Sequence, residues 1–542
     1  MIQSSHFVVS AGRVLTQSSC SGSKRPTGPI TIAITQRRYP DQASLKCQAP
    51  HAARRFFAEP PLAAFTTFTL STTFNSSWFR HALSFHALAN LERMAPRLPF
   101  PRYKEKTWLR RRHYMRAKRL RLFGVGAAAL CLIAIFVGSP SDVGRSHFFK
   151  DQSYHFQTLR ALSHEPFGGS DTEEVLETIK HIRSGDAQGW YNAWNATAER
   201  TLALAERTQN AQSKGGAFLR AHTYFLTAEF FLPPSDPKRS IATQKNVSAF
   251  YNGLAAVGVK WERMDAPYGN GYRLPMNYYP ADAQNRKSTL LVFQGGYDST
   301  LEELYFDLVK DAHDHGYDIL TFSGPGQGSV LTEQKLPFTY EWEKPTSAVM
   351  DTFLAHHERP RKIVLIGQSM GGYLAPRAAA FDNRFDGVVA YDVFFDMGAA
   401  ARRFVPKPIF WLRDHGMTGL ADTLIHLKES RSPGVRWALD NAMWTLGKEH
   451  PLDAIDEFQK YSLAGVAQHI HGDVLLMAGT EDHFVPFNQV KQMQEALTSA
   501  RSVTTKIYDR ESGGREHCQM GAPTLWHAAL FDWLSEKFES RP

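Results

Sequence analysis

The stretch 362–381 constrains the fold of this 542-residue chain more than any other. It begins with Lys-Ile-Val-Leu-Ile, which has the composition of a buried strand, and it ends with a small-residue segment typical of a helix. Between them lies Gly-Gln-Ser-Met-Gly, with a serine between Gly367 and Gly371. A tight strand-to-helix turn of this kind holds a serine hydroxyl clear of the sheet, above the positive end of the helix. The pattern therefore predicts Ser369 as a nucleophile, with glycines that let neighbouring backbone pass close by.

From residue 285 onward, predicted strands alternate with predicted helices. The strands are short apolar runs, and the helices are longer segments with apolar residues at helical spacing. The strands are 290–293, 318–322, 362–366, 386–391, 473–479 and 504–508, and the helices are 301–316, 346–356, 373–381, 488–497 and 523–538. This alternation predicts an α/β fold with a mostly parallel sheet, helices on both faces and a site at the C-terminal ends of the strands.

Two mainly helical regions accompany this pattern. Residues 397–470 interrupt the alternation, and we expect them to be an insertion that forms part of a cap. Residues 150–257 contain helical patterns with aromatic stripes, which we expect to face a core. A helical block in this position can fold over the site as a lid and supply the substrate pocket. We therefore predict a helical, lid-like region at 150–257 and a catalytic domain at 258–540, which begins with a β-hairpin.

The N-terminal part divides into three segments. Residues 1–93 are rich in Ser, Thr, Ala, Phe and Arg and nearly free of acidic residues, which is typical of a transit peptide. The alternative is that they precede a true start at Met94. Residues 94–121 form a basic segment that leads into the uncharged segment 122–138. About seventeen such residues lie at the short end of what spans a bilayer.

We therefore predict a single-pass membrane protein anchored through residues 122–138. Basic residues ahead of the apolar segment favour a cytoplasmic N-terminus, which would place the catalytic domain on the non-cytoplasmic side. A cleaved signal peptide and a buried helix are the alternatives, and they would give a secreted or a soluble cytoplasmic protein.

The charge and the cysteines exclude other classes. The formal net charge of +9 is concentrated in residues 1–121, and the catalytic half is close to balanced, so we expect no nucleic-acid partner. Only Cys518 of the four cysteines follows the apolar segment, so we expect no disulfide framework. Metal-ligand spacing is also missing from the sequence, and we predict neither a structural metal nor a cofactor.

A serine nucleophile needs a base, and the base needs an acid that orients it. In hydrolases with this turn, the chain order is serine, acid, histidine. Asp482 follows the predicted strand 473–479 and is the predicted acid, with the adjacent Glu481 as the alternative. His517 lies in a polar loop between the last strand and the last helix, from which it can reach back over the sheet edge, and is the predicted base.

Two other histidines lie near these positions in the sequence. His483 is too close to its acid along the chain, and His527 lies within the terminal helix. We expect both to be structural.

The negative oxygen that develops during the reaction needs two backbone N–H groups. Met370, which follows the nucleophile, is expected to supply one of them. The second is expected from Gly296 or Tyr297, after the strand 290–293. The run Gly-Pro-Gly-Gln-Gly at 324–328 lacks the Lys-Ser/Thr of a phosphate loop and does not indicate a nucleotide site.

Taken together, these motifs resemble one branch of the α/β-hydrolase superfamily. The residues that carry the resemblance are Gly-Gly-Tyr-Asp-Ser-Thr at 295–300, Gly-Pro-Gly-Gln-Gly at 324–328, Gly-Gln-Ser-Met-Gly-Gly-Tyr-Leu-Ala-Pro-Arg-Ala-Ala-Ala at 367–380, and the loops of Asp482 and His517. The branch includes 2,6-dihydroxypseudooxynicotine hydrolase and the yellowish-green-type polyketide-shortening hydrolases of fungi. The similarity covers roughly residues 150–540, and the membrane segment departs from the pattern of the branch's soluble members.

The resemblance implies hydrolysis of a C–C bond next to a ketone, with a helical region closed over the site. It also implies an acidic residue that handles the ketone, for which Asp298 is the candidate and Glu302 the alternative. We therefore predict a serine hydrolase that acts on a C–C or ester bond of a small carbonyl substrate from secondary metabolism, such as a polyketide. The alternatives are a general carboxylesterase or thioesterase and a catalytically silent, membrane-tethered binding protein. A homodimer is a candidate assembly.

Overall fold

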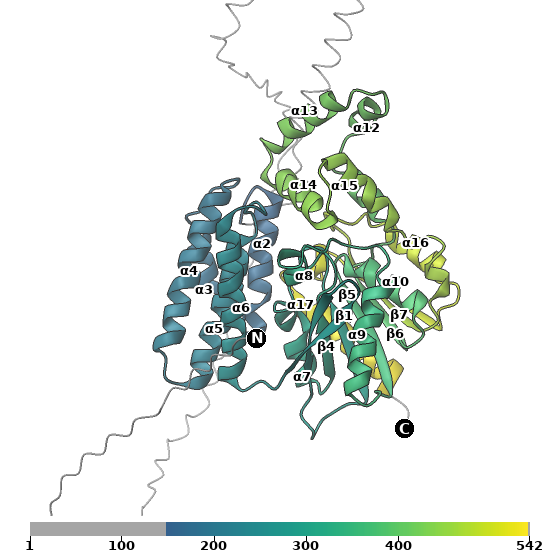
Figure 1. Ribbon diagram of the computed structural model, residues 1–542. Coiled ribbons are helices and arrows are strands. Elements are labelled where there is room, and N and C mark those ends of the chain that lie inside the picture. The colour runs from purple at the N-terminus through teal and green to yellow at the C-terminus, as the bar shows by residue number, and fades with distance from the viewer. Residues whose placement is uncertain (1–147, 540–542) are drawn as a thin grey trace, which may run out of the picture. The chain divides into compact units, whose positions relative to one another are not determined.

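The computed structural model describes residues 148–539 (Figure 1). The predicted extension at 1–93, the basic segment at 94–121 and the apolar segment at 122–138 lie outside the described residues. The prediction of a single-pass membrane protein is contradicted, because within residues 148–539 no helix is both long and apolar enough to cross a bilayer. The longest helices there, α4 and α6, carry charged and polar residues along their length.

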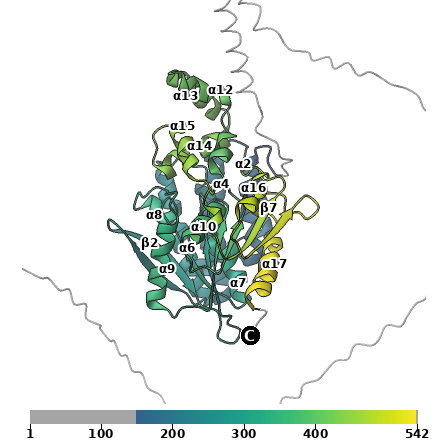
Figure 2. The same cartoon turned by 90° about the vertical axis from the view of Figure 1, so that its right-hand side faces the viewer.

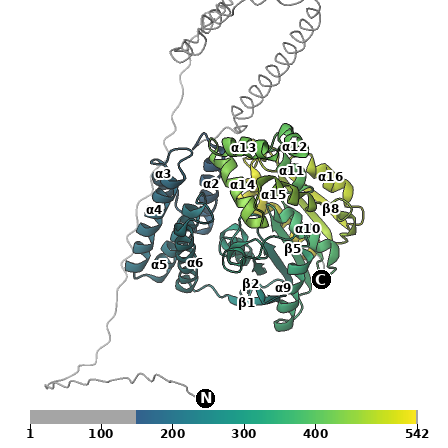
Figure 3. The ribbon, with the colours of Figure 1, turned by 45° about the horizontal axis from the view of Figure 1, so that its top comes forward.

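The first part of the described chain is helical. Helices α3 to α6 lie side by side, and α2 packs between them and α14 (Figure 3). Asp151, Asp186, Asn210 and Asp236 accept backbone N–H groups at the starts of α2, α4, α5 and α6. The bounds are α2 (Gln152–Ser163), α3 (Thr172–Ile179), α4 (Ala187–Arg207), α5 (Ala211–Glu229) and α6 (Pro237–Val257). The aromatic stripes form the core of this region, with Trp190, Trp194, Tyr154, Tyr224 and Phe225 fully buried.

An eight-stranded sheet follows, with the strand order β1-β2-β4-β3-β5-β6-β7-β8. The strands are β1 (Glu262–Tyr268), β2 (Tyr272–Tyr279), β3 (Thr289–Gln294), β4 (Asp318–Phe322), β5 (Lys362–Gln368), β6 (Gly387–Tyr391), β7 (Asp473–Gly479) and β8 (Ser502–Tyr508). The β1–β2 hairpin pairs antiparallel with β4, and all pairs from β4 to β8 are parallel. The predicted α/β-hydrolase fold, mostly parallel with a helical N-terminal region, is confirmed.

Helices cover both faces of the sheet because successive strand residues point to opposite sides. Leu290 and Val292 of β3 enter one core with α9 (Glu343–His356), α10 (Gly371–Phe381) and α16 (Gln489–Ala496). Leu291 and Phe293 enter a second core with the π-helical turn η2 (Tyr305–Val309), α7 (Lys310–Asp314) and α17 (Pro523–Leu534). The predicted helix at 301–316 therefore includes a π-helical turn, which the pattern of apolar residues did not indicate.

Between β6 and β7 the chain forms a group of helices. Figure 2 shows α14 and α15 above the edge of the sheet, with α12 and α13 beyond them. Their bounds are α11 (Met397–Arg402), α12 (Lys407–Asp414), α13 (Thr418–Glu429), α14 (Pro433–Leu446) and α15 (Pro451–Glu457). Trp437 of α14 stacks on Phe230, just after α5, with 4.6 Å between ring centroids. These helices therefore contact the N-terminal helical region.

The turn from β5 into α10 is packed against neighbouring backbone. A Cβ atom on Gly367 would lie 2.0 Å from the carbonyl oxygen of Gly371, and one on Gly372 would lie 1.5 Å from that of Asp392. On Gly371 the nearest atom would be 3.2 Å away. The close approach expected at Gly367 is therefore present, whereas the second severe constraint falls on Gly372 rather than Gly371.

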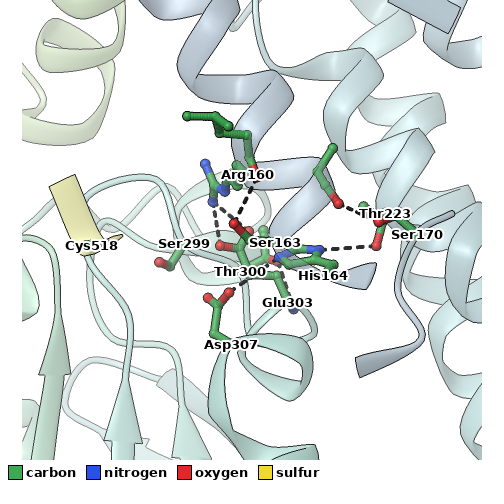
Figure 4. A network of polar contacts seen from close by, with 12 residues as sticks. Arg160, Ser163, His164, Ser170, Thr223, Ser299, Thr300, Glu303, Asp307 and Cys518 are labelled. Atoms are coloured by element: carbon green, nitrogen blue, oxygen red, sulfur yellow. Dashed lines mark hydrogen bonds and ion pairs between the residues drawn. The ribbon is translucent and has the colours of Figure 1, made fainter. Parts of the chain in front are cut away.

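Helix α2 is tied to the catalytic domain by a buried ionic network (Figure 4). The guanidinium of Arg160 contacts Asp298 Oδ2 at 2.6 Å and both carboxylate oxygens of Glu303, at 2.5 and 2.6 Å. The side chain of Glu303 is only 1% exposed. One turn along the helix, His164 Nε2 lies 3.3 Å from Asp307 Oδ1. The segment after β3 is thus fixed by a cation from the N-terminal region.

We expect Gly372→Ala to destabilise the fold by about 2 kcal/mol or more, because the added methyl group must displace the Asp392 backbone. Gly371→Ala is the matched control and should change the unfolding free energy by less than about 1 kcal/mol, since its methyl group, 3.2 Å from the nearest atom, needs only a small shift of its neighbours and alanine favours a helix. Urea denaturation of the two variants measures the difference. Equal stabilities would contradict this account of the turn.

We expect Arg160→Met to lower the unfolding free energy by about 3 kcal/mol, because it leaves the Glu303 carboxylate buried without its cation. Adding Glu303→Gln to the same chain removes the uncompensated charge and should recover part of the loss. Denaturant unfolding of wild type, single and double variants gives these values. A single variant as stable as the wild type would show that the network does not hold α2 in place.

Candidate active site

Ser369 lies at the tip of the turn between β5 and α10. Its φ of 58° is in the left-handed region, which non-glycine residues rarely adopt. The neighbouring backbone holds this conformation, since Gly372 N–H donates to the Ser369 carbonyl and Ser369 N–H donates to the Tyr391 carbonyl. The strained serine predicted from the sequence is therefore present in the structure.

Three predicted residues come together through His517. Its Nε2 lies 2.8 Å from Ser369 Oγ, and its Nδ1 lies 2.7 Å from Asp482 Oδ2. Ser369 follows β5, Asp482 follows β7, and His517 lies in the loop between β8 and α17, so the three side chains meet at the C-terminal edge of the sheet. The imidazole of His517 is 3% exposed.

The charges of this trio support one another. Burial opposes protonation of His517, but the adjacent Asp482 carboxylate outweighs it and raises the pKa of His517 well above its usual value. Burial likewise acts to raise the pKa of Asp482, yet the pairing with His517 lowers it below the usual range. Asp482 Oδ1 also accepts the backbone N–H groups of Phe484 and Val485, at 2.7 and 2.8 Å. The acid is therefore fixed independently of the histidine.

The alternative acid and the other histidines have separate partners. Glu481 pairs with the guanidinium of Arg510. His483 Nδ1 lies 3.3 Å from Glu516. His527 Nδ1 lies 2.7 Å from Asp311 Oδ2, on the sheet face that α17 covers.

The segment after β3 packs directly against Ser369, the predicted nucleophile. A Cβ atom on Gly296 would lie 2.8 Å from Gln368 O, from Met370 N and from Ser369 Cβ. Gly296 N–H donates to Ser299 Oγ at 2.9 Å, so this amide is already engaged. Of the two sequence candidates for the second oxyanion donor, Gly296 therefore has its N–H engaged by a side chain of its own loop.

The two candidate acids for a substrate ketone differ in their surroundings. Asp298 is paired with Arg160, as described above, and its side chain is partly exposed. Glu302 is buried, and the hydroxyl of Tyr251 donates to it at 3.3 Å. Burial raises the pKa of Glu302 above its usual value.

A cavity of about 160 Å³ adjoins this segment. Helices α2, α5, α6 and α14, the segment after β3 and α8 (Gly328–Thr332) line it, and it reaches the catalytic edge through Tyr297 and Asp298 rather than through Ser369. Asn246 lines the cavity, is 1% exposed, and has no hydrogen-bond partner for either side-chain amide atom among residues 148–539. Arg239 also lines it, with its guanidinium 4.7 Å from the centroid of the Trp444 ring. The cavity therefore combines aromatic walls with polar groups that a ligand can engage.

Sequence reasoning missed one residue at the catalytic edge, Asp392. It follows β6 directly, is 1% exposed, and places Oδ2 3.2 Å from His517 Nδ1. The available signal was an aspartate at the end of the predicted strand 386–391. It was missed because Asp482 already satisfied the chain order of the three catalytic residues.

Asp392, His517 and Cys518 also bring three potential metal ligands within 4.8 Å of one another. However, His517 Nδ1 faces carboxylates, and burial raises the pKa of the Cys518 thiol to about 12, which disfavours the thiolate that binds metals. These residues fit a hydrogen-bonded acid–base site better than a metal centre.

The chain is similar to known hydrolases. Residues 290–523 match the model of the alpha/beta hydrolase family. Among curated proteins, it is 30% identical over 420 residues to the hydrolase acrC of Aspergillus aculeatus and 31% identical over 414 residues to the hydrolase LUC6 of a Fusarium species, covering 72% of this chain and 98% of each relative. It is 30% identical over 410 residues to the 20-hydroxy-prefusarin hydrolase FUS2 of Gibberella moniliformis, covering 72% of this chain and 97% of that protein.

Solved structures agree at the level of the fold. The crystal structure of 2,6-dihydroxy-pseudo-oxynicotine hydrolase matches with a TM-score of 0.54 and 19% identity, over 70% of this chain and 96% of that one. AbyA5 matches with a TM-score of 0.52 and 16% identity, over 71% of this chain and 95% of that one. Because the chain spans nearly the whole length of relatives to which it is 30–31% identical, it belongs to the alpha/beta hydrolase family.

Proposed function

We propose that this hydrolase uses Ser369 as its nucleophile, His517 as its base and Asp482 as the group that orients the base. The observation that carries the proposal is the unbroken chain of short contacts, 2.8 Å from Ser369 to His517 and 2.7 Å from His517 to Asp482. A serine hydroxyl becomes a useful nucleophile only with such a base in contact. The strained φ of Ser369 supports the same role.

The reaction would proceed through an acyl-enzyme. Ser369 Oγ bonds to the substrate carbonyl carbon while His517 Nε2 takes the hydroxyl proton, and the N–H groups of Met370 and Tyr297 stabilise the oxyanion. His517 then gives its proton to the departing atom, which is the oxygen of an ester or the α-carbon of a ketone enolate. Water attacks the acyl group with His517 again as the base, and the carboxylic acid and free Ser369 are released.

The substrate class we propose is a carbonyl-bearing secondary metabolite such as a polyketide, cleaved at a C–C or an ester bond. Two of the similar proteins are named for substrates, 20-hydroxy-prefusarin and 2,6-dihydroxy-pseudo-oxynicotine, which supports a small-molecule substrate. The adjoining cavity would hold the part of the substrate away from the reacting carbonyl, with Arg239 and Asn246 as polar contacts. Of the two acids, Glu302 is the better candidate to handle a substrate ketone, since Arg160 already occupies Asp298.

We expect a fluorophosphonate probe to label the wild type and to leave Ser369→Ala unlabelled, because the probe reacts only with an activated serine. Turnover of a reactive ester should fall by about 10⁴-fold or more in this variant, with the fold unchanged. Ser347→Ala, at a half-buried position of α9 away from the site, is the control and should label like the wild type. Labelling of Ser369→Ala would contradict the proposed nucleophile.

Assays on two substrates distinguish hydrolysis of an ester bond from hydrolysis of a C–C bond. We expect purified protein to hydrolyse both p-nitrophenyl butyrate and a β-diketone such as benzoylacetone, since a triad serves both reactions once a ketone enolate can leave. Chromatography of the diketone products measures C–C cleavage, with Ser369→Ala as the blank. Turnover of the ester without any diketone product would remove C–C hydrolysis and leave an esterase.

A further inference from the structure

The imidazole of His517 lies between two buried carboxylates. Asp482 Oδ2 approaches Nδ1 to 2.7 Å and Asp392 Oδ2 approaches the same atom to 3.2 Å. Nδ1 carries a single hydrogen, so Asp482 takes the stronger bond and Asp392 is a second acceptor within reach. The two acids come from different strand ends, Asp392 after β6 and Asp482 after β7.

Like Asp482, Asp392 accepts hydrogen bonds from groups other than the imidazole of His517. Its Oδ2 accepts the backbone N–H of Cys518 at 2.6 Å, and its Oδ1 accepts from the side-chain amide of Gln519 at 3.3 Å. The hydroxyl of Tyr391 donates to the Cys518 carbonyl, so the residue before Asp392 also contacts the residue after His517. The end of β6 is therefore joined by hydrogen bonds to the two residues that follow His517.

We propose that Asp392 is a positioning residue for His517, a second carboxylate that shares the Nδ1 hydrogen with Asp482 and can orient the ring when Asp482 is removed. This rests on the proposed function, in which His517 is the base. When His517 takes the Ser369 proton, the resulting imidazolium faces both carboxylates, and each contributes to its stability. No atom is transferred to Asp392 during the reaction.

The two carboxylates also affect how kcat/KM depends on pH. The titratable groups that face Asp392 are Asp482, His517, Cys518, Tyr391 and Tyr508. Burial, with the Asp482 charge as a further cause, raises the pKa of Asp392, and the negative form of Asp392 favours protonated His517. A base must start neutral, so the acid limb of kcat/KM reports the pKa of His517. Removing the Asp392 charge lowers that pKa and moves the acid limb to lower pH.

The test measures kcat/KM for p-nitrophenyl butyrate against pH in Asp392→Asn, Asp482→Asn and the double variant. We expect Asp482→Asn to lose about 10²-fold, well short of the roughly 10⁴-fold loss typical of a triad acid. Asp392→Asn should lose about 10-fold and shift the acid limb to lower pH. The double variant should lose about 10⁴-fold, because no carboxylate then faces Nδ1.

A control variant separates this role from general loss of a carboxylate that is paired with a histidine. Asp311 is half-buried and pairs with His527 at 2.7 Å, between the helices α7 and α17, and Asp311→Asn should leave the acid limb unchanged. An unshifted acid limb in Asp392→Asn overturns the proposal. If Asp392→Asn does not fold, Asp482→Asn decides alone, and a loss near 10⁴-fold overturns it. Failure of the proposed function itself is distinct, since Ser369→Ala or His517→Ala would then keep wild-type turnover.

Discussion

The close approach of three backbone segments around Ser369 is the constraint on which the rest of the site depends. Gly367 lets the end of β5 meet α10, Gly372 lets α10 meet the segment after β6, and Gly296 lets the segment after β3 meet the nucleophile. A side chain at any of these positions would meet an atom at 2.8 Å or less. Because the contacts are between backbones, they fix the Ser369 hydroxyl and the neighbouring amides as one unit, and the favourable packing of both cores outweighs the strained φ of Ser369.

The loop that carries His517 is ordered by polar contacts. His517 has only two ring nitrogens, yet one faces the serine and the other faces two carboxylates. Each carboxylate is satisfied by other donors, which lets two negative charges lie buried near one imidazole at a tolerable cost. Two carboxylates, each from the end of a different strand, therefore lie beside Nδ1, whereas a triad requires only one carboxylate.

Much of the fold and part of the site could be predicted from the sequence because they follow local rules. The alternation of strands and helices predicted the parallel sheet, and the pattern at 367–371 predicted that Ser369 lies at the tip of a turn. Asp392 and Arg160 could not be predicted, since their importance comes from contacts with residues 125 and 138 positions away, which no local spacing records. Gly372 was missed for the same reason, as the atom it avoids belongs to Asp392. The predicted membrane arrangement was wrong, since no helix of residues 148–539 is long and apolar enough to cross a bilayer.

Helix α2 shows that the N-terminal helical region also contacts the segments that carry the proposed catalytic residues. Arg160 holds the segment that carries Tyr297, through Asp298 and Glu303. On the same face of the helix, one turn before and one turn after Arg160, Phe156 lies 6.1 Å from the His517 ring, and Ser163 Oγ accepts the N–H of Gly521 just beyond that histidine. One helix thus contacts both the proposed oxyanion segment and the proposed base. A displacement of α2 would therefore disturb both segments at once.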